Sequence, residues 1–151
     1  MEHTELPLFS KGLEFVAATN YKDAATCFES LILAFPQSDL ADDAAYNIAL
    51  CLYEMNKFEE AIKQLRDLLV KYPNATIYSS DNMENGRTSA KAYYLMINCY
   101  LGQGNPGKAH EILPILEKYP DSYILQNGKM ITFHELAKNA LQIYDTIVRK
   151  K

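Results

Sequence analysis

The chain has 151 residues, 48% of them hydrophobic, so it can bury a core of its own without disulfide bonds. Its formal net charge of -4 disfavours nucleic acid as a partner, because binding the phosphate backbone needs a basic face. No apolar run approaches the ~18 residues of a membrane-spanning helix, so the composition predicts one small soluble domain.

Helix signals recur along the whole chain, and most predicted helices begin at a capping residue or a proline. These starts are, in chain order, Leu6-Pro7, Asn20, Ser38 or Asp39, Asn56, Asn105-Pro106 and Thr132. Asn56 and Glu59 resemble a capping box for a helix over residues 57–69. A further helix carries Tyr93, Met96, Ile97 and Tyr100. Residues 74–88 and the stretch after Pro120 are predicted to be loops. The chain is therefore predicted to hold seven helices and no strand.

One pattern occurs three times: an alanine, a large apolar residue four positions later, and then an aromatic-proline pair. The copies are Ala24, Phe28 and Phe35-Pro36; Ala61, Leu65 and Tyr72-Pro73; and Ala109, Leu113 and Tyr119-Pro120. Twelve residues before each alanine stands a second recurring position, held by Gly12, Ala49 and Ile97. A small residue there lets two helices approach closely, and the proline ends the second helix. Such a repeated helix-turn-helix unit predicts an α-solenoid, a fold that usually holds another protein.

These positions resemble the tetratricopeptide repeat, a unit of about 34 residues with a W-x2-L-G-x2-Y…A-x3-F…P pattern. The matching residues are Leu8, Gly12, Phe15, Ala24, Phe28 and Pro36; then Ala45, Ile48, Ala49, Leu52, Ala61, Leu65 and Pro73; then Tyr93, Met96, Tyr100, Ala109, Leu113 and Pro120. Ala24 and Ala61 are 37 residues apart (61 minus 24), and the junction at residues 35–43 reads Phe-Pro-Gln-Ser-Asp-Leu-Ala-Asp-Asp. Both features are similar to the subclass of bacterial envelope proteins that includes the outer-membrane assembly lipoprotein.

The resemblance implies an all-α fold, a right-handed α-solenoid of three helical hairpins with a C-terminal capping helix. The repeats are expected at about 5–38, 42–75 and 89–121 within residues 5–122, and the amphipathic capping helix at 130–150. The apolar face of that last helix is expected to consist of Phe133, Leu136, Ala140, Leu141, Tyr144, Ile147 and Val148. In the alternative, this helix fills the groove of the solenoid instead of stacking on the last repeat.

Two features depart from the repeat. Ala61 and Ala109 are 48 residues apart (109 minus 61), so about a dozen extra residues lie in the polar stretch 74–88. This insertion is either a tolerated surface loop or a functional one, and we expect it to be mobile in the free protein. Pro114 falls in mid-helix, where it removes a backbone hydrogen bond, so we expect the sixth helix to kink or end early.

The resemblance also implies where a partner binds, because ligand contacts in this family come mainly from the first helix of each repeat. The corresponding residues are Phe9, Leu13, Val16, Tyr46, Leu50, Tyr53, Lys91, Tyr94, Asn98 and Leu101. Only Lys91 and Asn98 remain of the Lys/Asn set that clamps a carboxylate in some relatives. A groove lined by aromatic residues and leucine instead predicts an amphipathic helix or extended apolar segment of a partner protein as the ligand.

The sequence offers little for catalysis. It contains no Ser/His/Asp or Cys/His spacing and no glycine-rich phosphate loop. His110 and His134 come within reach of each other only if the last two helices pack together, and no carboxylate or cysteine pattern accompanies them. We therefore expect no enzyme activity, no cofactor and no metal.

The cysteines Cys27, Cys51 and Cys99 are odd in number and lie in apolar helical stretches, which predicts reduced thiols. The first residues carry neither the basic nor the apolar region of a signal peptide. These features predict a cytoplasmic, bacterial adaptor or scaffold for one protein partner. The alternatives are a self-assembling structural module, with a homo-oligomer formed through the groove or an end, and a scaffold domain of an envelope complex.

Overall fold

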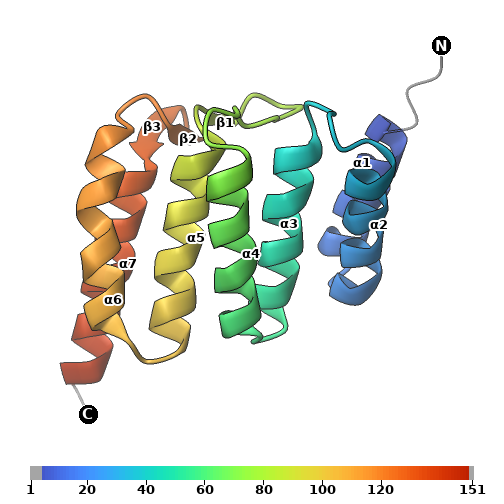
Figure 1. Ribbon diagram of the computed structural model, residues 1–151. Coiled ribbons are helices and arrows are strands. Elements are labelled where there is room, and N and C mark those ends of the chain that lie inside the picture. The colour runs from blue at the N-terminus through green and yellow to red at the C-terminus, as the bar shows by residue number, and fades with distance from the viewer. Residues whose placement is uncertain (1–4, 150–151) are drawn as a thin grey trace. The chain divides into compact units, whose positions relative to one another are not determined.

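The computed structural model describes residues 5–149, and the chain divides into two compact units, Met1–Ala75 and Thr76–Lys151 (Figure 1). These described residues hold seven α-helices, one 3-10 helix and one three-stranded sheet. The helices of the first unit are α1 (Glu5–Ala17), α2 (Tyr21–Ala34), α3 (Ala41–Glu54) and α4 (Phe58–Lys71). The second unit contains β1 (Glu84–Asn85), α5 (Thr88–Gly102), α6 (Pro106–Ile112), the 3-10 helix η1 (Leu113–Lys118), β2 (Tyr123–Gln126), β3 (Lys129–Thr132) and α7 (Phe133–Arg149). The predicted helical-hairpin fold is confirmed.

In the first unit each helix packs against the next one along the chain, and an apolar cluster fills the space between α1, α2 and α3. Its buried members are Phe9, Ala24, Phe28, Leu31, Leu40, Ala44, Ile48 and Cys51. The rings of Phe9 and Phe28 meet edge to face with 5.6 Å between their centroids. A Cβ atom on Gly12 would lie 2.6 Å from the Phe28 ring. The small residue of the first repeat is therefore required by the close crossing of α1 and α2.

The three helical hairpins share one kind of turn. After the first helix of each hairpin comes a residue with positive φ: Thr19 (59°), Asn56 (62°) and Gly104 (73°). The N–H of the next residue donates to a carbonyl five positions earlier: Asn20 to Phe15, Lys57 to Leu52 and Asn105 to Tyr100, each at 2.8 Å. This bond closes a Schellman motif. The same turn in all three hairpins shows that the repeat extends to the backbone.

The helix caps agree only in part with the sequence. The capping box predicted from Asn56 is wrong, because Asn56 ends α3 and Lys57 occupies the N-cap of α4. Asn105 does cap α6, since its Oδ1 accepts from the N–H of Lys108 at 3.3 Å. Thr132 likewise accepts from the N–H of Glu135 at the start of α7. The prediction failed for a physical reason: asparagine is common at the N-cap of a helix, but it also tolerates the positive φ that is needed just after a helix ends.

Pro114 acts as predicted. α6 ends at Ile112, and the chain continues as η1, with Pro114 in the first turn of this 3-10 helix. α5 packs against α6, η1 and α7. α7 also contacts α6 and η1. The last helix of the described chain is thus held by the third hairpin.

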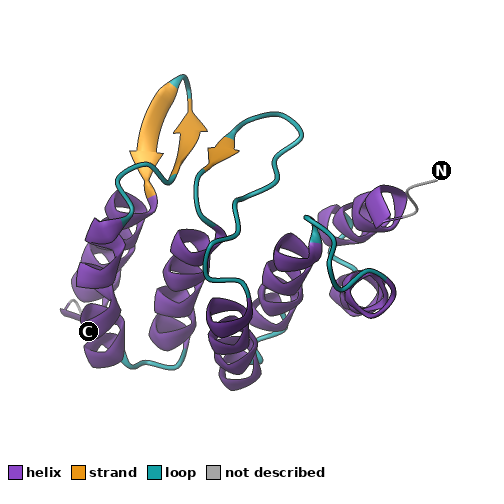
Figure 2. Cartoon of the chain, turned by 45° about the horizontal axis from the view of Figure 1, so that its top comes forward, coloured by secondary structure: helices purple, strands orange, loops and turns teal. Residues whose placement is uncertain are grey.

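The prediction of no strand is wrong. β2 and β3 form an antiparallel hairpin around Asn127-Gly128, whose φ angles of 53° and 75° define a type I′ turn (Figure 2, strands in orange). β1 lies in the 74–88 insertion and pairs with β2, and the Ile77 N–H donates to the Gly86 carbonyl at 2.8 Å. The insertion is therefore partly ordered by backbone hydrogen bonds, and the stretch after Pro120 is a hairpin rather than a loop.

Candidate functional site

The predicted site residues of α5 follow one side of the helix and are all half-buried: Lys91, Tyr94, Asn98 and Leu101. The Tyr94 ring packs near Phe133, the first residue of α7, with 6.1 Å between centroids. The adjacent Tyr93 points elsewhere, since its ring lies 6.3 Å from that of Tyr119, which follows η1. The side of α5 that carries the predicted residues therefore faces α7 and solvent.

Polar contacts occupy two members of this row. The Lys91 ammonium pairs with the Glu84 carboxylate of β1. The Asn98 side-chain amide donates to the Tyr94 carbonyl one turn earlier, at 3.2 Å. The remaining members, Tyr94 and Leu101, give this side of α5 its apolar surface.

α7 carries two apolar stripes. The buried stripe consists of Phe133, Ala137 and Leu141, each at most 2% exposed. The second, which we call the open stripe, consists of Leu136, Ala140, Ile143 and Ile147. At 3.6 residues per turn it lies about a quarter of a turn from the buried stripe. Ile143 is 61% exposed and Ile147 56%, while the other two are half-buried.

The contacts of α7 show where the open stripe points. His134 lies 3.7 Å from Glu117 of η1, and Asp145 lies 3.9 Å from His110 of α6. Phe133, about a third of a turn round from these residues, faces α5. Continuing in the same direction leads to the open stripe, which is therefore turned away from α6. Its first members, Leu136 and Ala140, adjoin the row on α5, and the stripe continues toward the C-terminal end of α7. The two rows form one surface, which we call the α5–α7 face.

Tyr144 and Val148 lie on the same side of α7 as the buried stripe, with Tyr144 half-buried and Val148 49% exposed, and most other residues of α7 are polar. Its last side consists of exposed residues: Glu135, Lys138, Asn139, Gln142 and Thr146. α7 thus combines the packing of a terminal helix with an apolar contribution to the α5–α7 face.

The predicted site residues of the first unit differ in exposure. Phe9 is 3% exposed and Tyr46 7%, so both belong to the packed interior. Leu13 is 40% exposed. The other predicted residues are half-buried: Val16, Leu50 and Tyr53. These four reach solvent, and their role in binding stays a prediction.

Sequence reasoning assigned α7 to packing alone and omitted Ile143 from its apolar face. A signal was available, because the apolar arc from Ile143 round to Leu141 covers almost half of the helix. A helix that packs on one side needs an apolar stripe only about 100° wide. The surplus width indicates a second apolar contact.

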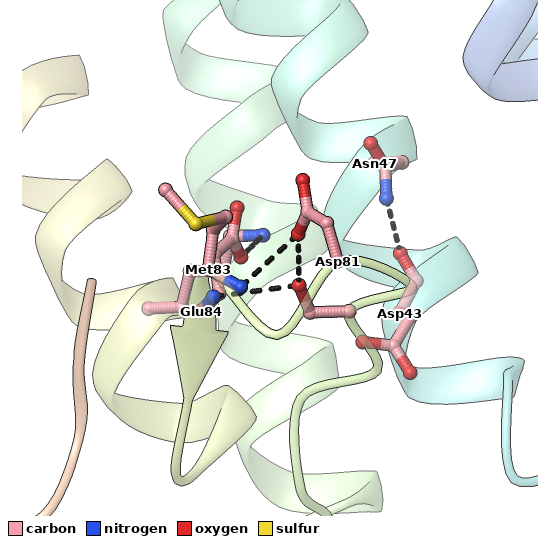
Figure 3. Close-up of polar contacts among 7 residues, drawn as sticks. Asp43, Asn47, Asp81, Met83 and Glu84 are labelled. Carbon is pink, nitrogen blue, oxygen red and sulfur yellow. Dashed lines mark hydrogen bonds and ion pairs between the residues drawn. The ribbon is translucent and has the colours of Figure 1, made fainter. Parts of the chain in front are cut away.

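Side-chain contacts within the insertion hold one of its turns (Figure 3). Asp81 Oδ1 accepts from the Met83 N–H at 3.0 Å and from the Ser79 hydroxyl at 2.8 Å. These bonds, the one from Met83 first, lower the pKa of the Asp81 carboxyl. The turn that they hold leads directly into Glu84, the partner of Lys91. The insertion thus borders the start of α5.

Reactive chemistry finds no support in the described structure. All three cysteines are free thiols. Burial raises the pKa of Cys99 to about 12, and burial followed by the nearby Glu54 carboxylate raises that of Cys51 to about 11. Both thiols are therefore protonated and poorly nucleophilic at neutral pH. Among residues 5–149, no three His, Cys, Asp or Glu side chains gather as metal ligands, and no helix is long and apolar enough to cross a membrane.

Comparison with known proteins agrees with this geometry. Residues 9–76, from α1 to just beyond α4, match the tetratricopeptide-repeat family. The match covers the part of the chain in which the sequence pattern places the first two repeats. No sequence among curated proteins matches the chain significantly.

Solved structures with similar folds align with this chain, two of them over nearly its whole length. The type III secretion translocator chaperone SycD of Yersinia enterocolitica aligns with a TM-score of 0.66 at 16% identity, over 99% of this chain and 96% of its own. The Hsp90 co-chaperone Cns1 of Saccharomyces cerevisiae aligns with a TM-score of 0.67 at 12% identity, over 97% of this chain but 41% of its own. The TPR domain of Arabidopsis FLU has a TM-score of 0.58 at 20% identity, over 74% of this chain and 89% of its own. The likeness identifies the second unit, too, as part of a tetratricopeptide-like fold.

Proposed function

We propose that this protein is a non-enzymatic adaptor that binds an apolar helix or extended apolar segment of a partner protein. The observation that carries the proposal is the α5–α7 face, which runs from Tyr94 and Leu101 on α5 to Ile143 and Ile147 in the C-terminal half of α7, where the two isoleucines expose more than half of their surface. Apolar surface of this kind costs free energy in water and is stabilised when a partner covers it. The names of two structural neighbours, a translocator chaperone and a co-chaperone, also support a protein partner.

The shape of the face favours a helix as the ligand. Leu136, Ala140, Ile143 and Ile147 span twelve residues, or ~16 Å along α7. A partner helix laid beside this stripe can place side chains at i, i+3/i+4 and i+7 against it. In the first unit Leu13 is exposed, and the predicted residues Val16, Leu50 and Tyr53 are half-buried. We propose that these residues form a second apolar contact with a partner.

Affinity capture with matched variants tests the proposal. Ile147→Asp places a charge on the open stripe, whereas Thr146→Asp places the same charge on the polar side of the same turn. We expect the first variant to lose the partner and the second to retain it, with similar melting temperatures, because both residues are exposed. Equal capture by both variants would contradict a binding role for the stripe.

We further propose a bacterial cytoplasm as the compartment. Three unpaired thiols, two of them fully buried, support a reducing environment. The proposed membership of the envelope-type subclass rests on the spacing of 37 residues between Ala24 and Ala61 and on the junction sequence of residues 35–43.

A further inference from the structure

The open stripe of α7 has the spacing of a coiled-coil seam. Leu136, Ala140, Ile143 and Ile147 follow one another at intervals of four, three and four residues, which is the alternation of heptad positions a and d. The exposed positions beside this seam, Asn139 and Thr146, are uncharged. No like charges therefore oppose the approach of a second, identical helix.

The seam is complementary to itself in one orientation. If two copies of α7 pack antiparallel with the two-fold axis between Ala140 and Ile143, Leu136 lies opposite Ile147 of the second copy. Ala140 then lies opposite Ile143 of the second copy, so a small side chain meets a large one twice. A parallel arrangement would instead set alanine against alanine and leave a gap at that level.

We propose that, in the absence of a partner, the open stripe is covered by a second copy of this chain, with the two α7 helices antiparallel. Such an isologous contact uses the same surface on both copies and closes without forming a filament. One three-turn seam is smaller than a standard protein interface. The dimer is therefore weak and reversible, with a Kd on the order of 10 µM to 1 mM.

This inference rests on the same stripe as the proposed function and adds a regulatory consequence. Ile143 and Ile147 cannot contact a second copy and a partner at the same time. Self-association and partner binding are therefore mutually exclusive, and the dimer shields apolar surface until a partner displaces it.

Sedimentation velocity of the full chain, over about 10 µM to 1 mM, tests the dimer directly. We expect concentration-dependent dimers for the wild type and for Thr146→Asp, whose charge lies on the polar side. Ile143→Asp buries a charge in the seam and should weaken dimerisation at least about tenfold. Ile147→Asp, which is similarly exposed, should do the same, and circular dichroism verifies that each variant is folded. A wild type that stays monomeric throughout, or a dimer that survives both seam variants, would overturn the proposal.

Disulfide trapping tests the orientation. In a Cys27→Ser background the other native cysteines, Cys51 and Cys99, are fully buried. Mixing Ala140→Cys protein with Ile143→Cys protein should give mainly the mixed disulfide on mild oxidation, because these positions are opposite in the antiparallel pair. A preference for like-with-like disulfides would refute that pairing. If the wild type is monomeric and Ile147→Asp still abolishes partner capture, the dimer is refuted and the proposed function stands. If the wild type dimerises and Ile147→Asp does not affect partner capture, the proposed function is refuted and the dimer stands.

Discussion

Gly12→Ala probes the closest helix crossing in the first unit. Two effects oppose each other: alanine favours the helix by about 1 kcal/mol relative to glycine, while an added methyl in a packed interior costs about 1–3 kcal/mol. The added Cβ would lie 2.6 Å from the Phe28 ring. That ring is fully buried and held by Phe9 at 5.6 Å, so it has little room to retreat. The clash should win, with a net loss of about 1–2 kcal/mol.

Thermal and urea unfolding measure this loss, and the expected fall in melting temperature is about 2–8 °C for a chain of this size. Gly107→Ala is the matched control, because its Cβ would meet only the Asn105 side-chain oxygen at 3.7 Å. That variant should be neutral or more stable by up to about 1 kcal/mol. Phe28→Leu should relieve part of the clash in a double-mutant cycle. If Gly12→Ala is as stable as the wild type, the crossing is looser than this reasoning requires.

Three further predictions concern the second unit. Gly86→Ala should release the insertion, because Gly86 has a φ of 111° and its Cβ would lie 2.5 Å from a Ser122 backbone atom; loss of exchange protection at the Ile77 amide would reveal it, and unchanged protection would argue against it. Ending the chain at Gly128 should give a strongly destabilised or aggregating protein, since the buried stripe of α7 is lost; an equally stable monomer in light scattering would refute this. The lowered pKa of Asp81 means that its turn is favoured at neutral pH and lost as pH falls through that pKa, so the Met83 amide signal should titrate with a midpoint below the ordinary 3.8; a midpoint at or above 3.8 would contradict it.

The repeat could be predicted because the residues that define it also perform the packing. Gly12 and Phe28 belong to the pattern because the Phe28 ring packs closely against the backbone at Gly12. Pro114 could be interpreted from the sequence because a proline interrupts an α-helix at almost any interior position. The hairpin was missed although Asn127-Gly128, between two short apolar runs, is a usual hairpin signal. Its flanking strands are only four residues long, and they are stabilised by pairing with β1, which lies far away in sequence.

The candidate site was harder to predict for a different reason. Periodicity shows that a residue lies on an apolar side, but not which neighbour covers that side. Phe9 and Tyr46 occupy expected groove positions and are buried, whereas Ile143 and Ile147 lie on a helix assigned to packing and are exposed. The tertiary contacts of each helix decide whether such a residue is buried or exposed. The pattern of apolar residues within one helix does not reveal those contacts.

Site-specific photo-crosslinking measures the central claim most directly. A photoreactive amino acid at position 143, on the open stripe, should crosslink to one partner segment whose sequence forms an amphipathic helix or an extended apolar strand. The same group at position 139, on the polar side of α7, should give little of that product. Equal crosslinking from both positions, or none from position 143 while the partner is bound, would contradict the proposal that the α5–α7 face holds the partner.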